Sequence, residues 1–455
     1  MRHKKRWLAC VLAIALLLPA VPTASAAAFT DISGHWAQSN IQRAADNNWF
    51  RGISDTQFAP DMMMTRGMFV KVLGEYSGDA IDRNAGNTKF KDVDASKYYA
   101  PYVNWAYQSG IVNGTSSTTF SPNTAITREQ IAVMFVNYAN AKKLILPRNR
   151  KWNGFADVNS CANYALDSIY TLYRTGVING MPNNRFSPKT AATRAQCAAL
   201  LCRFFDVTHQ LPDASVQVPL ISHSGYNLSA GENTLYAYEL AAQYEYQYVE
   251  TDIRFTADNV PVLIHDATID RTSNGKGTVS KMTYQQLLQY DFSEGKAQPC
   301  QITSFETFMQ YCSQMGLTAY VELKTKITAQ QAQILMNIAR SANMQDHCIW
   351  ISYEYDALTM IRSTLHYAPL SLVCNQVTDK VITQINQLKN GKNTVTLCAL
   401  YTQLTAAQKA KLIRNNIGLI VWPVDRYQDC IQQVNSSAQA ITTNAITRQI
   451  LYPHS

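Results

Sequence analysis

The stretch YVETDIRF, Tyr248–Phe255, decides the fold that the second half of this chain can adopt. Its β-branched and aromatic residues predict a strand. Because side chains alternate between the two faces of a strand, Glu250, Asp252 and Arg254 share one face. The stretch therefore predicts a strand that carries two carboxylates and a guanidinium toward a common site.

Strand-like and helix-like runs alternate on both sides of this stretch, as in 233–246 and 328–342 for the helices. The strand candidates are residues 218–223, 248–255, 261–265, 318–324, 348–352, 370–374, 394–400, 419–424 and 440–443. A (β/α)₈ barrel needs eight strands, so one of the nine is expected to be an extra loop strand, and 394–400 is the least secure. A doubly wound sheet is the alternative, but Gly275-Lys276-Gly277 follows no strand and offers no nucleotide turn.

Chemically active residues lie at or near the ends of these predicted strands. His223 ends the first candidate and His265 ends the third, while Glu322 and Lys324 share one face of the fourth. In a barrel the active site forms at the carboxyl ends of the strands. Oxygen-rich ligands favour Ca²⁺ or Mg²⁺, and two imidazoles suit a base and an acid near neutral pH. The sequence predicts a metal-assisted site with paired acid and base catalysis.

Residues 218–455 resemble the glycerophosphodiester phosphodiesterase family. The matching motifs are Ile221-Ser222-His223, Gly231-Glu232-Asn233-Thr234, Val249-Glu250-Thr251-Asp252, Val260 to Asp266 (VPVLIHD), Asp270 to Gly275 (DRTSNG), Val321-Glu322-Leu323-Lys324 and Val421-Trp422. The resemblance implies a TIM barrel that hydrolyses glycerophosphodiesters, or a glycerophosphate polymer, and that releases sn-glycerol 3-phosphate and an alcohol.

The resemblance also assigns roles within this site. It implies that Glu250, Asp252 and Glu322 hold the divalent metal and that His223 and His265 serve as acid and base. The implied substrate-binding residues are Glu232, which lies near the metal, Lys324, which meets phosphate oxygens, and Trp422, which walls the pocket. The strand pattern, rather than the resemblance, adds Arg254 to this set.

One departure from the family motif bears directly on activity. The family reads His-Arg-Gly where this chain has His223-Ser224-Gly225, so an arginine that contacts phosphate is replaced by serine. Arg254 shares the metal-binding face and is the replacement that the sequence offers. The alternative is a catalytically weak or inactive surface protein that binds wall polymer or another polyanion. A smaller departure is Asn444, where the family often has aspartate.

The first half of the chain contains three repeats with four markers in constant order. The markers are Phe29-Thr30-Asp31, Phe90-Lys91-Asp92 and Phe155-Ala156-Asp157; then Gly52, Gly114 and Gly180; then Phe58-Ala59-Pro60, Phe120-Ser121-Pro122 and Phe186-Ser187-Pro188; then Thr65-Arg66, Thr127-Arg128 and Thr193-Arg194. Each threonine is a natural N-cap, and Gln130 completes a capping box with Thr127. The pattern predicts helix, loop, helix, three times, with the units packed together.

These repeats, at residues 28–76, 89–140 and 154–206, resemble S-layer homology repeats. The resemblance implies an all-α bundle that holds secondary cell-wall polysaccharide on a bacterial surface. The implied binding residues are Asp31, Trp36, Gly52, Arg66, Asp92, Gly114, Arg128, Asp157, Gly180 and Arg194. In the first repeat, Met68 stands two residues after Arg66, where the family usually has an acid. Tyrosines replace tryptophan in repeats two and three.

The N-terminus predicts export. Residues 1–26 have the charged start, apolar centre and Ala24-Ser25-Ala26 cleavage site of a signal peptide. No later stretch is long enough to span a membrane, and residues 207–217 predict a linker. The formal charge is +8, of which four positive charges lie in the signal peptide, so +4 remains on the predicted mature chain. No basic run interleaved with aromatics indicates nucleic acid. Nine cysteines remain without a C-x-x-C pair, which favours buried thiols, with disulfides left open.

Overall fold

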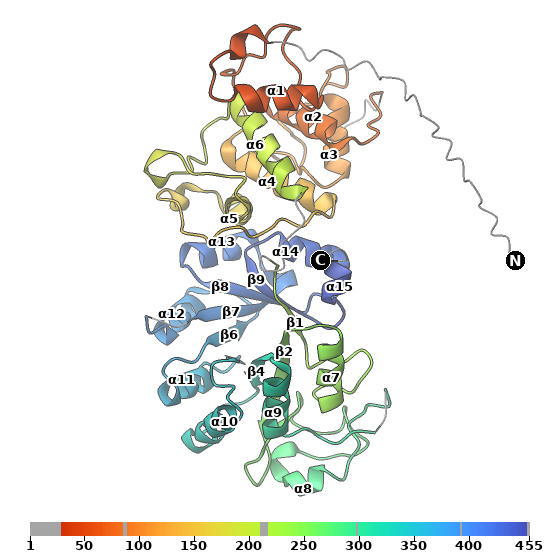
Figure 1. Cartoon of the computed structure of the whole chain (residues 1–455), viewed down its shortest axis with the longest axis vertical. Coiled ribbons are helices and arrows are strands. Elements are labelled where there is room, and N and C mark those ends of the chain that lie inside the picture. Colours follow the sequence, from red (N-terminus) through yellow and green to blue (C-terminus); the bar gives the residue numbers. More distant parts are fainter. Residues whose placement is uncertain (1–28, 85–88, 210–216, 297–298, 392–393, 453–455) are drawn as a thin grey trace, which may run out of the picture.

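The computed structural model divides into a helical part and a barrel that lie end to end (Figure 1). The structure describes residues 29–84, 89–209, 217–296, 299–391 and 394–452. The predicted signal peptide and most of the predicted linker lie outside the described residues. None of the helices in these ranges is long and apolar enough to cross a membrane. All nine cysteines in the same ranges are free thiols, most of them buried.

The helical part consists of three helix pairs, one from each repeat. They are α1 (Gln38–Asp46) and α2 (Arg66–Ser77), α3 (Ala100–Gln108) and α4 (Arg128–Ala141), and α5 (Asn163–Thr175) and α6 (Arg194–Thr208), with the short 3₁₀ turns η1 (Thr30–Ile32), η2 (Val158–Ser160) and η3 (Pro182–Asn184). The hydroxyls of Thr65, Thr127 and Thr193 cap α2, α4 and α6. The capping box at Thr127 is confirmed, and Thr193 has a second one.

The three repeats close on one another in a ring of backbone hydrogen bonds. The amide of Ile126 donates to Met64 O at 2.8 Å, that of Met64 to Ala192 O at 2.9 Å, and that of Ala192 to Ile126 O at 3.0 Å. Each of these residues lies just before the second helix of its repeat. Because every repeat supplies both a donor and an acceptor, none completes its hydrogen bonds without the other two.

The repeated aspartates have structural partners inside the bundle. The Asp92 carboxylate accepts hydrogen bonds from Phe120 N at 2.8 Å and Ser121 N at 2.7 Å. Asp31 and Asp157 bond the corresponding amides of their own repeats. These bonds hold a loop in which Ala59, Ser121 and Ser187 have positive φ. The repeated markers therefore first serve to fix this loop.

The second part is a closed barrel of eight parallel strands with one antiparallel addition. The strands are β1 (Leu220–Ser222), β2 (Tyr248–Phe255), β3 (Pro261–Leu263), β4 (Thr318–Leu323), β5 (Cys348–Ser352), β6 (Leu370–Cys374), β7 (Val395–Leu400), β8 (Gly418–Trp422) and β9 (Ala438–Thr443). Their order is β1-β9-β8-β7-β6-β5-β4-β2-β3, and a β1–β2 pairing closes the ring. The predicted TIM barrel is confirmed.

The structure corrects which of the nine candidates is the extra strand. The run 394–400 is the least secure of the predicted strands, but β7 pairs with both β6 and β8 and belongs to the barrel. The extra strand is β3, which runs antiparallel to β2 outside the ring. It folds back on β2 after a turn at Asn259, whose φ is positive.

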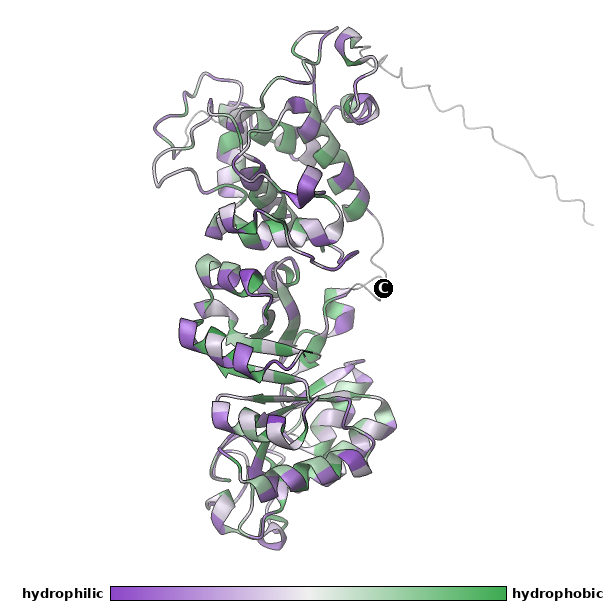
Figure 2. Cartoon of the chain, turned by 90° about the vertical axis from the view of Figure 1, so that its left-hand side faces the viewer, coloured by the Kyte–Doolittle hydropathy of each residue, from purple (hydrophilic) through white to green (hydrophobic). Residues whose placement is uncertain are grey.

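Helices surround the barrel and complete its core. They are α7 (Leu235–Gln243), α8 (Tyr284–Leu287), α9 (Phe305–Met315), α10 (Ala329–Ser341), α11 (Tyr355–Thr364), α12 (Asp379–Leu388), α13 (Ala406–Arg414), α14 (Tyr427–Val434) and α15 (Arg448–Leu451), with the turns η5 (Val279–Lys281) and η6 (Tyr401–Gln403). Figure 2 shows apolar residues along the strands and polar residues on the outer helices. A separate small core, around Val262, Ile264 and Phe292, supports the excursion between β3 and α9.

The third repeat packs directly against the barrel, along α5 and α13 (Figure 1). Ala410 and Ile413 of α13 are buried in the core of the helical part. Arg414 donates to Asn163 Oδ1 and Cys161 O, both at 2.8 Å. Buried apolar contacts and directed hydrogen bonds together fix the helical part on one side of the barrel.

The glycine at position 114 gives a test of the structural role of the repeated markers. Gly110 and Gly114 both have positive φ, but only at Gly114 would a Cβ meet Phe90 at 2.5 Å. We expect Gly110→Ala to cost about 1 kcal/mol of local stability and Gly114→Ala to cost about 3 kcal/mol, because overpacking adds to strain. Hydrogen exchange of peptides from residues 89–140 of the full chain measures both. Equal exchange in the two variants would contradict the packing role.

Candidate active site

Three carboxylates meet on the inner face of β2 and β4. The parallel register places Asp252 beside Glu322, and Glu250 lies two residues earlier on the same face of β2. One ligand oxygen from each of the three lies within 4.8 Å of the others. Glu250 and Asp252 are buried and Glu322 is nearly so. The predicted metal ligands are therefore brought together.

The triad carries more negative charge than the protein around it balances. Burial raises the pKa of Glu250 well above its usual value, and the charges of Asp252 and Glu322 raise it further. Burial alone would raise the pKa of Asp252, but the Lys324 ammonium and the two nearby histidines hold it below its usual value. Lys324 Nζ lies 2.9 Å from Glu322 Oε1 and 3.3 Å from Asp252 Oδ1. One ammonium thus faces three carboxylates.

One oxygen of the triad has no partner. Glu250 Oε2 accepts the Ser224 amide at 2.9 Å, whereas Glu250 Oε1 is buried and has no hydrogen-bond partner among the described residues. A buried carboxylate oxygen without a donor is costly. A hard divalent cation accepts oxygen ligands of this type, so the three side chains fit the metal that the sequence predicts.

His223 lies just after β1 and is oriented by a chain of side chains. Its Nδ1 lies 2.9 Å from Asn444 Oδ1. Asn444 Nδ2 donates to Asp425 Oδ2 at 2.9 Å, which fixes the amide with its oxygen toward the ring. Asn227 Nδ2 donates to the same oxygen at 2.8 Å. Because an amide oxygen only accepts, His223 carries its hydrogen on Nδ1 and leaves Nε2 as an acceptor.

His265 reaches the carboxylates by way of the antiparallel strand β3. The Ile264 amide donates to Asp252 O at 2.9 Å, so the chain returns to the level of the triad. His265 Nδ1 lies 2.8 Å from Asp266 Oδ1, and Asp266 also accepts from Arg271 Nε at 2.7 Å. The Asp266 carboxylate, held by Arg271, therefore orients this ring.

A cavity of about 120 Å³ joins the two histidines and two of the acids, Glu250 and Glu322. Lys324, Tyr353 and Trp422 also line it. Trp422 Nε1 is buried without a partner among the described residues, so it is a free donor at the wall. The sequence does not predict Tyr353 as a site residue, because it lies in the turn between β5 and α11 and belongs to no recognisable motif.

Two predicted substrate-binding residues lie at the edge of this site. Glu232 bonds Arg271, with Nη1 at 3.0 Å from Glu232 Oε2, and it is not part of the triad. Arg254 donates through Nε to His265 O at 2.9 Å and does not line the cavity. The buried Ser224 donates its hydroxyl to Asp252 Oδ2 at 3.3 Å. Position 224 therefore offers the carboxylates a neutral hydroxyl, and Arg254 is not among the residues that line the cavity.

Family models match both parts of the chain. The model described as "Glycerophosphoryl diester phosphodiesterase family" matches residues 223–448. The model described as "S-layer homology domain" matches residues 28–67, 89–132 and 154–198. The chain carries a glycerophosphoryl diester phosphodiesterase domain. The triad, the two histidines and Lys324 all lie within that domain, and the three S-layer homology domains precede it.

Individual relatives cover one part of the chain or the other. An exoglucanase, XynX, of Acetivibrio thermocellus is 30% identical over 183 residues, which are 40% of this chain and 17% of the relative. Glycerophosphodiester phosphodiesterase 1 of Bos taurus is 35% identical over 118 residues, 24% of this chain and 34% of the relative. The chain spans less than a fifth of the first of these curated relatives.

Two further comparisons cover nearly the whole length of the other protein. A glycerophosphodiester phosphodiesterase of Caldanaerobacter subterraneus is 23% identical over 233 residues, 50% of this chain and 93% of the relative. The structure of an Oleispira antarctica phosphodiesterase in complex with the product sn-glycerol-3-phosphate has a TM-score of 0.46 at 20% identity, covering 52% of this chain and 96% of that one.

The three S-layer homology arginines stabilise contacts between repeats. Arg66, Arg128 and Arg194 donate through Nε to the carbonyls of Phe120, Phe186 and Phe58, each at 2.8 Å. Each guanidinium also lies over the ring whose carbonyl it bonds, at 4.5–5.0 Å from the centroid. The arginine of one repeat thus reaches the loop of the next, and the third returns to the first. Trp36, by contrast, is 61% exposed.

The unbalanced charge of the phosphodiesterase triad predicts how it binds metal. Because burial raises the pKa of Glu250, a proton held there in the metal-free chain must leave when a cation binds. Calorimetry in buffers of different ionisation enthalpy should find release of up to about one proton per Ca²⁺ or Mg²⁺ at pH 7. Glu250→Gln and Glu322→Gln should weaken binding by about a hundredfold or more.

Glu306→Gln is the matched control, since Glu306 is exposed at the start of α9. It should leave both the affinity and the proton release unchanged. Unchanged cation binding in both triad variants would show that the ligands lie elsewhere.

Proposed function

We propose that the chain is a metal-dependent phosphodiesterase attached to a bacterial cell wall. Its reaction is the hydrolysis of a glycerophosphodiester to sn-glycerol 3-phosphate and an alcohol. The observation that carries the proposal is the pair of histidines, His223 and His265, that line one cavity with the buried carboxylates. Their different partners suit them to opposite proton transfers.

His223 is the proposed general base. Its Nδ1 hydrogen is committed to the neutral Asn444 amide, so Nε2 is free to accept a proton from the attacking hydroxyl. That hydroxyl belongs to water or to the neighbouring position of the substrate's own glycerol. Asp425 supports this role indirectly, because it orients the Asn444 amide, which in turn orients the His223 ring.

His265 is the proposed general acid. Its Nδ1 faces the Asp266 carboxylate, which balances a positive charge on the ring. Arg271 holds that carboxylate in place and lowers the pKa of Asp266 to about 2, so it stays ionised throughout the neutral range. The opposite nitrogen of the ring, Nε2, is the atom that delivers a proton to the departing alkoxide.

The remaining residues of the cavity bind and neutralise the phosphate. A bound Ca²⁺ or Mg²⁺ would supply positive charge to the phosphodiester oxygens. Lys324 stays protonated, because the charges of Asp252 and Glu322 outweigh burial and raise its pKa. Lys324 also lines the cavity, so its ammonium is placed to meet the phosphate. The Trp422 indole N–H supplies a further donor at the wall.

Ser224 favours a second candidate function. A hydroxyl bonded to the metal-binding carboxylates offers no charge to the phosphate, and the loss of a charge-assisted contact slows phosphoryl chemistry. A wall or polyanion-binding protein with little turnover is therefore the alternative. It predicts that changes to His223 and His265 leave the biological role intact.

The two histidine roles can be separated by the leaving group. On glycerophosphocholine, whose leaving group is a poor alkoxide, His223→Ala and His265→Ala should each reduce kcat by about 10²–10⁴-fold. On a p-nitrophenyl phosphodiester, whose leaving group needs no proton, His265→Ala should reduce kcat by less than about tenfold. His223→Ala should still reduce kcat by about 10²–10⁴-fold.

His347→Ala is the control for this measurement, because His347 lies outside the active-site cavity and precedes β5 at its amino-terminal end. It should match the unaltered chain on both substrates. The reverse pattern would exchange the two roles. Absence of turnover on both substrates with Ca²⁺ or Mg²⁺ would favour the binding-protein alternative.

Wall attachment is proposed for the S-layer homology domains. Each repeat exposes one large aromatic side chain near the start of its first helix, namely Trp36, Tyr98 and Tyr164 at 61%, 53% and 51% exposure. Exposed rings of this kind pack against sugar rings. The three arginines, by contrast, are partly committed to the fold.

The triple variant Trp36→Ala, Tyr98→Ala, Tyr164→Ala should therefore lose wall binding without unfolding. In a pull-down on purified cell walls we expect retention to fall by about tenfold or more, since each ring contributes about 1 kcal/mol. Tyr367→Ala, which removes a ring 69% exposed on the barrel, is the control. Equal retention of both would place the polymer elsewhere on the bundle.

A further inference from the structure

A groove separate from the active site follows the amino-terminal ends of the barrel strands. One part of it is a hollow of about 760 Å³ between the third repeat and the barrel. Pro219, Val395, Leu419 and Ser437 line it, and they stand at or close to the starts of β1, β7, β8 and β9. The active-site cavity lies at the opposite ends of the same strands.

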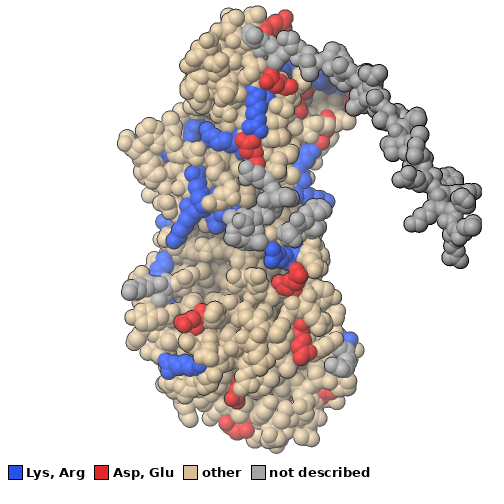
Figure 3. All heavy atoms as spheres, in the orientation of Figure 1, with Lys and Arg blue, Asp and Glu red and all other residues tan. Residues whose placement is uncertain are grey.

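Both parts of the chain contribute positive charge to this hollow. Arg148, Lys151 and Arg174 come from the third repeat and the segment before it, and Lys389 comes from the end of α12. No aspartate or glutamate is among the described residues that line the hollow. Figure 3 shows basic side chains gathered at the waist between the two parts of the molecule.

None of these cations forms a salt bridge within the described part of the chain, although the Asp167 carboxylate acts on Arg148 through its charge. Arg148 Nη2 donates to Val434 O at 3.1 Å and Lys389 Nζ to Asn386 Oδ1 at 3.0 Å. Arg174 Nε reaches only a carbonyl, at 3.5 Å. Burial lowers the pKa of Arg148 to about 10, and the nearby Arg174 adds to the effect. Repulsion between fixed cations is relieved when an anion binds between them.

Two buried polar side chains of the hollow are also without partners. Ser437 Oγ and Gln217 Nε2 make no hydrogen bond to any described residue. Ser437 is 6% exposed. Unsatisfied donors beside unpaired cations are the features of a site that accepts oxyanions.

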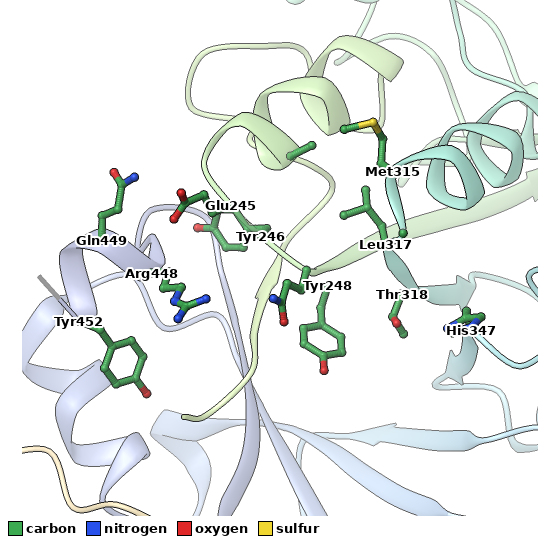
Figure 4. A pocket seen from close by; sticks show the side chains of 13 residues that line it. Glu245, Tyr246, Tyr248, Met315, Leu317, Thr318, His347, Arg448, Gln449 and Tyr452 are labelled. Atoms are coloured by element: carbon green, nitrogen blue, oxygen red, sulfur yellow. The ribbon is translucent and has the colours of Figure 1, made fainter. Parts of the chain in front are cut away.

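The groove continues along the barrel beyond this hollow. Gln217 and Pro219 also line a second hollow, which in turn shares Tyr248 and Arg448 with a third of about 790 Å³. Figure 4 shows Arg448 and Tyr452 on one side of the third hollow and Met315, Leu317 and His347 on the other. A groove of this length fits a chain of repeating units better than a small anion.

We propose that this groove binds a segment of an anionic wall polymer, a chain with one phosphate or carboxylate on each unit. It is a third contact with the wall, distinct from the exposed aromatic side chains of the S-layer homology domains and from the active site. The basic hollow holds the charged groups, and the aromatic side chains further along hold the polyol or sugar backbone. The inference does not depend on catalysis.

The test compares two triple variants of the full chain. The groove variant is Lys151→Gln, Arg174→Gln, Lys389→Gln, which spares Arg148 because that side chain also bonds barrel carbonyls. The control is Lys276→Gln, Lys281→Gln, Arg340→Gln, three exposed cations of the same kinds on the far part of the barrel. Both variants lose the same net charge, and none of these residues belongs to the proposed active site.

The probes are a ten-unit glycerophosphate oligomer, a ten-unit polygalacturonate and a ten-nucleotide single-stranded DNA, with binding followed by calorimetry. We expect the groove variant to bind the glycerophosphate or the galacturonate oligomer about tenfold or more weakly. Its salt dependence should also be shallower, by about one unit of slope for each ion pair that the substitutions remove. The control variant should bind like the unaltered chain. The tighter of the two oligomers identifies the charged group.

Unchanged affinity for both oligomers in the groove variant would overturn the proposal. So would DNA that binds more tightly than either oligomer and loses that affinity in the same variant. Turnover of glycerophosphocholine should be equal in the groove and control variants. The unaltered chain could lack turnover while the groove variant still binds the oligomers more weakly. That result would refute the catalytic proposal and support the polymer-binding groove.

Discussion

Three carboxylates held beside one another at the core of the active site are the main electrostatic constraint on the barrel. Removing an ionised carboxylate from water costs roughly several kcal/mol even after the protein relaxes, and mutual repulsion adds to this within 4.8 Å. Lys324, the Ser224 amide and Asn233 Nδ2 at 2.8 Å from Asp252 Oδ2 offset part of the cost. The rest remains as an unpartnered oxygen on Glu250. The barrel thus gives up stability to keep a site ready for a cation.

The sequence predicted this centre because its residues fall in short local patterns. Two acids separated by one residue in a strand must share a face, and the same holds for Glu322 and Lys324 on β4. The strand pairing could not be predicted in the same way. The run VTLCAL of β7 carries no charged residue and is buried on both faces, so no alternating pattern distinguishes a barrel strand from a loop strand. β3 leads into His265 but lies outside the ring.

Long-range partners are the other part that the sequence does not reveal. His223 and Asn444 are separated by 221 residues, and Asp425 completes their hydrogen-bond chain from yet another loop. The repeated aspartates present the converse difficulty. Their recurrence is visible in the sequence, but a marker that fixes a loop recurs as faithfully as one that binds a ligand. Only the hydrogen bonds from the Phe120 and Ser121 amides to Asp92 reveal that this aspartate fixes a loop.

The closed ring of repeats has a mechanical consequence. In a linear array, a pulling force passes through the units in series, and the weakest unit opens first. Here Arg194 of the last repeat bonds Phe58 of the first, and Met64, Ile126 and Ala192 bond one another in a circle. A load applied between a surface and the barrel is therefore shared by three interfaces that must break together. The barrel joins this ring of repeats through the contact between α5 and α13.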